Sequence, residues 1–266
     1  MEWEVGPGPR TFAALERREL SRDAESDSAT LMVRIPPAWK SVDLGDEATT
    51  EIFVLEGDLV VNGEAVGCGG YISLPPIGVA NALESRCGAQ VLVWHSHRLP
   101  VAPEAALRVT SIWAEPWQEG RLKGLPYGRL FKVLRANDVL EGPVQGGEAG
   151  FLRLNQWLPG YVAPNEHRHE VWEELIFLHG DWLTLERGQV AAGSYLGNPP
   201  GWWHGPLASR FGALAFVHSN RALGVELRDI EGGVAFSESY LRSGSLLDRP
   251  EHQGATALEP FIDLVR

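Results

Sequence analysis

The stretch Glu51-Ile-Phe-Val-Leu-Glu-Gly57 returns 123 residues later as Glu174-Leu-Ile-Phe-Leu-His-Gly180. Both stretches are short runs of β-branched and aromatic residues closed by glycine, a composition typical of a β-strand that ends in a turn. Because self-similarity at a fixed distance marks a repeated structural unit, the chain is predicted to carry one unit twice.

Similarity at the same distance extends to both sides of this stretch. Further pairs are Leu31 and Leu154, Pro36 and Pro159, Glu47 and Glu170, Asp58 and Asp181, Gly70 and Gly193, Pro76 and Pro199, Gly78 and Gly201, and His95 and His218. A slip of one residue is needed where Ser85-Arg-Cys-Gly-Ala89 meets Ser209-Arg-Phe-Gly-Ala213. Chance does not keep Gly and Pro in register over such a length, so the repeat sets the domain organisation.

Two prolines, Pro100 and Pro103, interrupt the pattern between the units. The chain is therefore predicted to form a first unit over residues 1–102, a second unit over residues 103–223 and a C-terminal extension over residues 224–266. The extension has no counterpart between the units, and it could pack on the other unit, support a dimer or stay mobile.

Short strands alternating with Gly and Pro turns predict an all-β fold of two β-barrels or jelly rolls. The 30 Gly and 18 Pro residues favour turns over long helices, and the apolar fraction of 44% is enough for a sizeable core. Helical periodicity is weak, apart from a short helix expected near Thr11 to Leu20 and another near the C-terminus.

Acidic residues dominate the charge of the chain. The 35 Asp and Glu residues against 23 Lys and Arg residues give a formal net charge of −12, and the basic residues are scattered. Such a surface repels phosphate groups, so nucleic acids and anionic membranes are not expected as partners.

The chain begins with Met-Glu-Trp-Glu-Val-Gly-Pro-Gly-Pro, without the basic cluster and apolar stretch of a signal peptide. No run of about 18 apolar residues follows, so a soluble, cytoplasmic protein is expected. The two cysteines, Cys68 and Cys87, have no metal-binding spacing and are too few for a disulfide framework, so buried free thiols are expected.

Four potential metal ligands are concentrated in the second unit. His167 and His169 lie two residues apart, so on a strand both imidazoles would face one point inside the barrel. Glu173 follows shortly, and His204 comes from a later strand. Imidazole and carboxylate suit zinc, iron, manganese or nickel, and three histidines with one carboxylate leave coordination positions open for water or substrate.

The spacing of glycines, prolines and potential ligands resembles the two motifs of the cupin superfamily. The first motif would run from Gly160 through His167, His169 and Glu173 to Gly180, and the second from Gly193 through Pro199 and Gly201 to His204. One extra residue follows the first glycine, and Ala208 stands where the family often has Asn. The resemblance covers residues 30–100 and 153–221, and it implies a bicupin with two tandem cupin barrels of the double-stranded β-helix or jelly-roll type, also called RmlC-like.

Within the superfamily, the stretches from Glu173 to Gly180 and from Gly193 to His204 are most similar to the ChrR-type cupins. That group includes the zinc-binding cupin half of some anti-sigma factors and relatives of the acetylacetone-cleaving oxygenase. The resemblance implies that the metal ligands are His167, His169, Glu173 and His204. The anti-sigma proteins carry a separate N-terminal zinc-binding helical domain, and the chain has no such His/Cys cluster, so their regulatory role does not transfer.

Glu173 and Glu174 compete for the role of carboxylate ligand, because the family allows three or four residues after the second His. The six residues that separate Glu173 from Gly180 favour Glu173. Glu174 has a counterpart, Glu51, in the first unit, which suggests a structural or surface role for this position.

The distance of 123 residues predicts one metal site per chain rather than two. The residues of the first unit that correspond to the four ligands are Leu44, Asp46, Thr50 and Asn81. None of them carries an imidazole, so the first unit is expected to be a degenerate barrel without a transition metal.

His95 and His97 repeat the spacing of the metal pair, but His95 corresponds to His218 on the last strand of the second unit. A histidine duplicated at one structural position is better explained as a hydrogen-bonded residue near the barrel end than as a ligand. His179 lies beside the Gly180 turn, where exposure is expected.

Aromatic side chains are expected around the metal. Trp157 lies on the strand before the histidine pair, and Trp202 has the strand parity to face the same cavity, so both are expected to line the substrate pocket with Asn155. Arg153 shares the strand face of Trp157. An apolar, aromatic pocket favours a small organic substrate over a sugar.

Two functions fit these features. The first is a metal-dependent enzyme, either an oxygenase or a hydrolase/isomerase, that acts on a small organic molecule. The second is a non-catalytic ligand-binding or sensor protein with a structural metal, in keeping with the degenerate first unit and the lack of further acid/base motifs. Pro164 stands three residues before His167, where oxalate-degrading cupins have Arg, which disfavours a dicarboxylate substrate. A homodimer is a further expectation, because sheet edges and the extension need partners.

Overall fold

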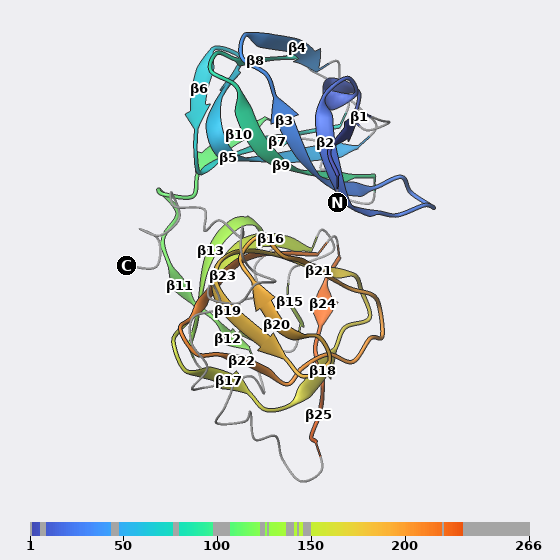
Figure 1. Ribbon diagram of the computed structural model, residues 1–266, viewed down its shortest axis with the longest axis vertical. Helices are drawn as coiled ribbons and strands as arrows, with labels where there is room; N and C mark the ends of the chain where they lie inside the picture. The colour runs from blue at the N-terminus through green and yellow to red at the C-terminus, as the bar shows by residue number, and fades with distance from the viewer. Residues whose placement is uncertain are drawn as a thin grey trace. The chain divides into compact units, whose positions relative to one another are not determined.

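Both units of the computed structural model consist of curled β-sheets (Figure 1). The structure describes residues 2–5, 9–43, 48–76, 80–97, 107–122, 126, 128–136, 141–142, 144–145, 150–219 and 221–230. The chain divides into two compact units, unit 1 over residues 1–115 and unit 2 over residues 116–266. Within the described ranges, the one helical element is the 3-10 turn η1 (Arg10–Phe12).

Unit 1 is built on a sheet of ten strands, connected in the order β1-β2-β3-β9-β5-β7-β10, with β4, β6 and β8 pairing off this path. All of its strand pairs are antiparallel. The strands are β1 (Glu4–Val5), β2 (Glu16–Arg22), β3 (Ala29–Ile35), β4 (Trp39–Asp43), β5 (Thr49–Val61), β6 (Glu64–Gly67), β7 (Gly70–Leu74), β8 (Asn81–Ser85), β9 (Ala89–Ser96) and β10 (Arg108–Ser111).

Unit 2 has a sheet of nine strands in the order β11-β13-β16-β23-β19-β22-β17, with β20 and β21 also pairing with β19. Three two-stranded sheets, β12-β14, β15-β24 and β18-β25, complete it. The strands are β11 (Gln118–Glu119), β12 (Arg121–Leu122), β13 (Arg129–Ala136), β14 (Glu141–Gly142), β15 (Val144–Gln145), β16 (Phe151–Trp157), β17 (Tyr161–Ala163), β18 (Glu166–Arg168), β19 (Glu173–Thr184), β20 (Gly188–Ala191), β21 (Tyr195–Asn198), β22 (Leu207–Ser209), β23 (Ala213–Ser219), β24 (Leu223–Gly224) and β25 (Glu226–Arg228).

Three antiparallel strands form the centre of each unit: β3, β9 and β5 in unit 1, and β16, β23 and β19 in unit 2. The pairing of β5 with β9 shifts between Val54 and Glu56, and that of β19 with β23 shifts between Phe177 and His179. Such an unpaired residue is a β-bulge, which bends the strand. The predicted repeat is therefore confirmed as two units with the same central sheet and the same bend, and the expected all-β fold of two tandem jelly-roll barrels is confirmed.

A glycine follows each bulge at a place where no side chain fits. Gly57 and Gly180 have φ angles of +79° and +86°. A Cβ atom on Gly57 would lie 1.9 Å from the carbonyl oxygen of Gly88, and one on Gly180 would lie 2.0 Å from that of Gly212. Both strands continue for four residues beyond the glycine, so the glycine permits a bend and does not close the strand as the sequence suggested.

The structural repeat does not keep a single distance. A Cβ atom on Gly88 would meet the carbonyl oxygen of Ile35, and one on Gly212 would meet that of Trp157, so these pairs are equivalent. Equivalent residues are thus 122 positions apart on β3 and β16, 123 on β5 and β19, and 124 on β9 and β23. One of the two insertions is the turn after β19, where residues 185–187 replace the two-residue turn 62–63 of unit 1.

The single distance used on the sequence therefore misaligned the last strands. His218 pairs with Glu174, whereas the residue that pairs with Glu51 in unit 1 is Trp94. The prediction that His95 and His218 occupy one duplicated position is wrong. Each is nevertheless hydrogen-bonded, because Nδ1 of His95 lies 2.9 Å from a threonine hydroxyl and Nδ1 of His218 lies 2.8 Å from the Glu174 carboxylate.

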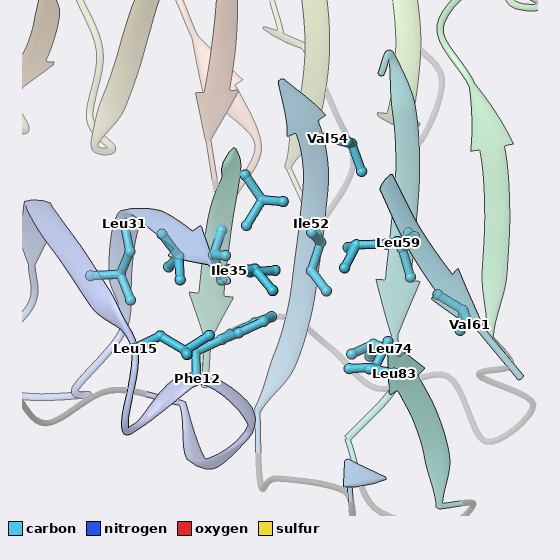
Figure 2. Close-up of a cluster of buried hydrophobic side chains, with 14 of the residues drawn as sticks. Phe12, Leu15, Leu31, Ile35, Ile52, Val54, Leu59, Val61, Leu74 and Leu83 are labelled. Atoms are coloured by element: carbon cyan, nitrogen blue, oxygen red, sulfur yellow. The ribbon is translucent and has the colours of Figure 1, made fainter. Parts of the chain in front are cut away.

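Hydrocarbon side chains fill the interior of unit 1. Figure 2 shows Leu31, Ile35 and Ile52 together with Leu15 among the strands of this cluster. Close packing of aliphatic groups removes apolar surface from water, which stabilises the barrel. The other buried members are Phe12, Ala29, Val33, Val54, Leu59, Val61, Val66, Ile72, Leu74, Leu83, Val91 and Val93.

The prediction of a helix near Thr11 to Leu20 is wrong, apart from a single 3-10 turn at its start. Only η1 is helical there, and β2 begins at Glu16 and pairs with β3. Hydrogen bonding to β3 outweighs the weak helical periodicity of this segment. The helix expected near the C-terminus lies outside the described residues. Among the residues that the structure describes, no helix is long and apolar enough to cross a membrane.

Both cysteines are free, as expected, but neither is fully buried: Cys87 is exposed and Cys68 is half-buried. Cys87 lies in the turn between β8 and β9, where its N–H donates to the Asp58 carboxylate at 2.8 Å. Cys68 lies in the turn between β6 and β7. Turns run over the surface, so the general tendency of free cysteine to be buried does not apply at these positions.

The domain boundary between residues 102 and 103 remains a prediction, because residues 98–106 lie outside the described part of the chain. The next strand, β10, pairs with β7 of unit 1, whereas β11 pairs with β13 of unit 2. The strand pairing thus assigns β10 to unit 1.

Replacing Gly180 by Ala should destabilise unit 2 by at least about 2 kcal/mol, because the new Cβ would overlap a carbonyl oxygen and the backbone is left-handed. Gly188→Ala is the matched control: its φ is +72° but nothing lies within 4 Å of the added Cβ. The control should lose only about 1 kcal/mol. Denaturant unfolding measures both changes, and equal losses would contradict the proposed overlap.

Candidate metal centre

Reciprocal backbone hydrogen bonds join the two predicted motifs of unit 2. The N–H of His167 on β18 donates to the carbonyl of His204, and the N–H of His204 donates to the carbonyl of His167, both at 2.9 Å. This bridge brings the two rings to a centroid distance of 4.1 Å. His169, just beyond β18, adds a third ring at 5.3 Å from His167 and 5.2 Å from His204.

The potential ligand atoms of these three rings converge. His167, His169 and His204 each offer one ring nitrogen, and these atoms lie within 4.8 Å of one another. Glu173, the first residue of β19, places one carboxylate oxygen 3.5 Å from Nε2 of both His169 and His204. The three imidazoles are buried. The structure therefore brings together all four residues that the sequence singled out.

Backbone carbonyls orient two of the imidazoles. Nδ1 of His169 lies 2.7 Å from the carbonyl oxygen of Gly224, and Nδ1 of His204 lies 3.1 Å from that of Trp202. Since a carbonyl only accepts, Nδ1 carries the proton in each neutral ring and Nε2 keeps its lone pair. Neither Nε2 atom has a hydrogen-bond partner in the described part of the chain. Buried lone pairs beside a carboxylate are a donor set that fits a transition metal.

The first residues of the C-terminal extension belong to this site. Gly224 orients His169, and β25 pairs with β18, the strand of His167. Two ion pairs cross these strands, Arg168 with Glu226 and Arg228 with Glu166. Residues 224–230 thus pack within unit 2, whereas residues 231–266 lie outside the described chain. The sequence held no signal for this role, because the segment matches nothing in unit 1.

The charge states of the site follow from burial and close contact. Burial, reinforced by His204 and His169, holds the pKa of His167 well below its usual value, so this ring stays neutral. Burial also acts to lower the pKa of His169, but the Glu173 carboxylate and the Gly224 carbonyl outweigh it and raise that pKa. Burial alone would raise the pKa of Glu173, yet His169 and His204 hold it well below its usual value. Glu173 is therefore an anion beside the imidazoles of His169 and His204.

Glu174 faces away from the imidazoles. Its carboxylate accepts a hydrogen bond from the Tyr195 hydroxyl at 2.6 Å and contacts His218 at 2.8 Å. In unit 1 the hydroxyl of Tyr71 likewise donates to Glu51. Because adjacent strand residues point to opposite faces, Glu173 alone of the two candidates reaches the imidazoles.

A cavity of about 50 Å³ lies beside the imidazoles. Trp157, Asn155 and Arg153 line it, as their alternation along one strand indicated. Trp157 packs on Trp182 with ring centroids 4.5 Å apart, which gives the cavity an aromatic wall. The remaining lining residues are Arg129, Tyr161, His167, His169, Glu173, Leu175, Thr184, Glu186, Arg187, Leu196, Asn198, His204, Leu207, Val217 and Val225.

Trp202 does not line this cavity, contrary to the expectation from sequence. Its side chain is 49% exposed. Its N–H donates to the carbonyl of Pro199 at 3.1 Å, so this segment is a turn and not a strand. Alternation of faces holds only along an extended strand, which is why strand parity failed here.

Several residues of the cavity wall were not found from the sequence, and four of them are polar or charged residues on or next to strands β13 and β19. Thr184 is the last residue of β19, Glu186 and Arg187 lie in the turn after it, and Arg129 comes from β13. Arg129 reaches the cavity because β13 pairs with β16 in the register that sets it opposite Trp157. Pairing between distant strands leaves no local signal in the sequence.

At the positions equivalent to four polar residues of the unit 2 cavity, unit 1 has three aliphatic side chains and one threonine. The equivalent pairs are Leu31 and Arg153, Val33 and Asn155, Thr50 and Glu173, and Leu74 and Asn198. The strands that follow are 124 residues apart, so the equivalent of His204 is Ala80 and not Asn81, the residue expected from the fixed distance of 123. Leu44 and Asp46, the expected counterparts of His167 and His169, lie outside the described residues. Among the residues that the structure describes, His167, His169 and His204 are the one group found that could hold a metal.

Comparison with known proteins agrees with this architecture. Residues 125–222 match the family model of the ChrR cupin-like domain. No curated protein has significant sequence similarity to the chain.

Solved structures share the fold across both units. A candidate dioxygenase from Nostoc punctiforme has 19% identity and a TM-score of 0.64, over 88% of this chain and 82% of that one. A candidate glyoxylate-induced protein from Pseudomonas aeruginosa has 15% identity and a TM-score of 0.59, over 88% and 85% of the two chains. A cupin 2 conserved barrel domain protein from Leptotrichia buccalis has 9% identity and a TM-score of 0.52, over 80% and 89%. At such identities the similarity establishes the cupin fold alone.

Exchanging each candidate carboxylate for its amide should separate the roles of the two neighbouring glutamates. Glu173→Gln removes the anion beside the imidazoles and should weaken zinc binding about 100-fold or more. Glu174→Gln, the matched control on the opposite face, should leave zinc affinity within about tenfold while lowering thermal stability. Competition with a chelator measures the affinity, and equal effects of the two changes would contradict the assignment.

Zinc affinity of the metal-free protein should fall as the pH decreases from about 8 to about 5.5. The pKa of His169 is raised, so this ring protonates at a higher pH than a free imidazole, and a protonated ring cannot bind a metal. Below that pKa the affinity should decrease about tenfold per pH unit for each proton displaced. Titrations against a chelator at several pH values test this, and a pH-independent affinity would rule out imidazole ligation.

Proposed function

We propose that this chain, a tandem cupin whose second unit matches the ChrR cupin-like family, is an enzyme that uses one mononuclear metal ion to act on a small organic molecule. The observation that carries this proposal is the convergence of three buried imidazoles on one point, with the Glu173 carboxylate beside them. Burying four such polar groups together is costly unless a cation joins them.

His167, His169, Glu173 and His204 would hold a divalent transition metal such as zinc, iron, manganese or nickel. When bound, the metal would polarise a carbonyl group or lower the pKa of a water molecule, and iron would add redox chemistry. Four protein ligands would leave room on a six-coordinate ion for substrate, and all four residues line the cavity.

The protein around the metal would position the substrate and exclude water. Trp157 and Trp182 form an aromatic wall, and Tyr161 stacks on Trp182 at a centroid distance of 5.9 Å. Polar groups at Asn155 and Asn198 add hydrogen-bonding capacity at defined points of this wall. A cavity of about 50 Å³ favours a molecule much smaller than a sugar.

A non-catalytic role with a structural metal is the second candidate, and the position of the ligands favours it in one respect. His167 lies on β18, which pairs with β25, so a metal could hold the C-terminal segment in place. Removal of the metal distinguishes the two roles. Loss of a structural metal lowers the stability of the fold, whereas loss of a catalytic metal causes little unfolding.

Elemental analysis of the purified protein should find one transition-metal ion per chain, and none after His169→Ala. If the metal is catalytic, the His169→Ala protein should keep a thermal midpoint within about 5 °C of the wild type while losing activity. Activity should be sought by oxygen uptake with a panel of β-diketones and by hydrolysis and isomerisation assays.

The second outcome, a much larger fall of the thermal midpoint on metal loss without any activity of the loaded protein, would favour the structural role. A well-folded wild-type protein that binds no zinc, iron, manganese or nickel would overturn both.

A further inference from the structure

Three arginines, Arg129, Arg153 and Arg187, line the cavity beside the imidazoles, and the first two are almost fully buried. Arg129 on β13 and Arg153 on β16 are 5% and 4% exposed. Guanidinium groups are rarely buried to this extent without an anion that pairs with them. The burial of Arg129 at the cavity therefore points to an anionic ligand.

Arg129 has unused hydrogen-bonding capacity. Its Nε and Nη2 atoms are buried and have no hydrogen-bond partner among the described residues. Leaving such donors unpaired costs free energy, more so for a charged group. These two nitrogens lie on one edge of the guanidinium plane, the edge that binds a carboxylate with two parallel hydrogen bonds.

Arg153 adds a second positive charge held in a fixed place. Its guanidinium lies over the rings of Phe131 and Phe151, at 4.1 Å and 4.2 Å from their centroids. Burial, together with repulsion from Arg129, lowers the pKa of Arg153 to about 9, so the group is still a cation at neutral pH.

Two carboxylates, Glu173 and Glu186, face three arginines in the cavity wall, which leaves one formal positive charge. Glu173 attracts both Arg129 and Arg153. Glu173 contacts two imidazoles, and Glu186 accepts a hydrogen bond from the N–H of Gly205 at 3.1 Å. A divalent metal on the imidazoles would add two further positive charges. A small enclosed space with this excess of positive charge favours an anionic ligand over a neutral one.

The fold itself does not need arginine at either position. In unit 1, Leu31 is equivalent to Arg153. Arg17 pairs with Val33 and Phe131 pairs with the equivalent residue Asn155, so Arg17 and Phe131 are equivalent. Leu15 and Arg129 each lie two residues earlier and therefore correspond to one another. Both leucines belong to the hydrocarbon interior in Figure 2. The arginines are therefore particular to the unit that carries the imidazoles.

The size of the cavity limits the ligand. A water-sized group needs roughly 10–15 Å³ of such space, so about 50 Å³ accommodates about three to five of them. This is enough for a carboxylate with one or two further heavy atoms.

We propose that the substrate of this site is a small carboxylate with an oxygen atom on the neighbouring carbon, held by a two-pronged ion pair with Arg129. The neighbouring oxygen faces the three imidazoles, and Arg153 adds long-range attraction. This inference rests on the proposed function, since it assigns the substrate class of the same site. Oxalate-degrading cupins have an arginine where this chain has Pro164. Arg129, which comes from β13, would bind the carboxylate without that arginine.

Binding of glycolate and of glycolamide tests the proposal, because the two molecules have the same size and differ in charge. Calorimetric titration of the metal-loaded wild-type protein should show glycolate binding at least about tenfold tighter. Arg129→Met should weaken glycolate binding about 30-fold or more and leave glycolamide binding within about threefold.

Arg17→Met is the matched control, since Arg17 is an equally buried arginine on β2 of unit 1 that does not line the cavity. It should leave glycolate affinity unchanged within about twofold. Circular dichroism checks that each variant is folded, and the comparison of the two ligands on wild-type protein needs no variant at all.

Metal content measured on the same samples separates the two proposals. A wild-type protein that holds metal but binds glycolate no better than glycolamide overturns the carboxylate assignment and leaves the proposed function standing. A protein that holds no metal yet discriminates glycolate through Arg129 overturns the proposed function and leaves the anion site. Unchanged glycolate affinity in folded Arg129→Met protein also overturns the assignment.

Discussion

The two hydrogen bonds between the backbones of His167 and His204 are the contact on which the rest of the site depends. They fix the distance between two segments that the sequence keeps apart, and their geometry leaves both imidazoles on the same side of the bridge. His169 then follows from the chain direction after β18, and Glu173 from the start of β19. Backbone carbonyls at Gly224 and Trp202 turn the ring nitrogens toward one point. A donor set made this way is oriented by the protein's own hydrogen bonds, and such pre-organisation reduces the cost of binding a ligand.

The two units show what the same sheet does with two different interiors. In unit 1 the inward positions of the central strands hold aliphatic side chains, so the barrel is stabilised by burial of hydrocarbon. In unit 2 equivalent positions hold Arg153, Asn155 and Asn198, which lose hydration when buried. A barrel that gives up hydrophobic burial in this way gains a polar cavity next to its imidazoles. The polar interior of unit 2 is thus not required by the shared sheet, while the bulge and its glycine, common to both units, belong to the fold.

Sequence analysis predicted the repeat, the all-β class and the four residues at the centre, because these depend on residue identity and on short spacings. It failed where a single spacing was extended too far and where a weak local pattern competed with strand pairing. One fixed distance aligned His95 with His218, although insertions between strands shift the last strand by one residue. Strand alternation put Trp202 in the cavity, although a turn interrupts the strand there. Weak helical periodicity near Thr11 gave way to pairing with β3. The first two errors came from assuming that a local rule continues through a turn, and the third from long-range strand pairing that local periodicity does not report.

The sequence by itself determined that the chain carries two units of one design and that only the second keeps three histidines and a carboxylate at cupin spacing. Those facts follow from residue types and from distances along the chain. Only the tertiary structure decided that Glu173 and not Glu174 meets the imidazoles, that Gly224 orients His169, and that Arg129 enters the cavity. The reason is physical: each of these contacts depends on which strands pair and in which register, and register is set by the packing of whole sheets rather than by neighbours in sequence.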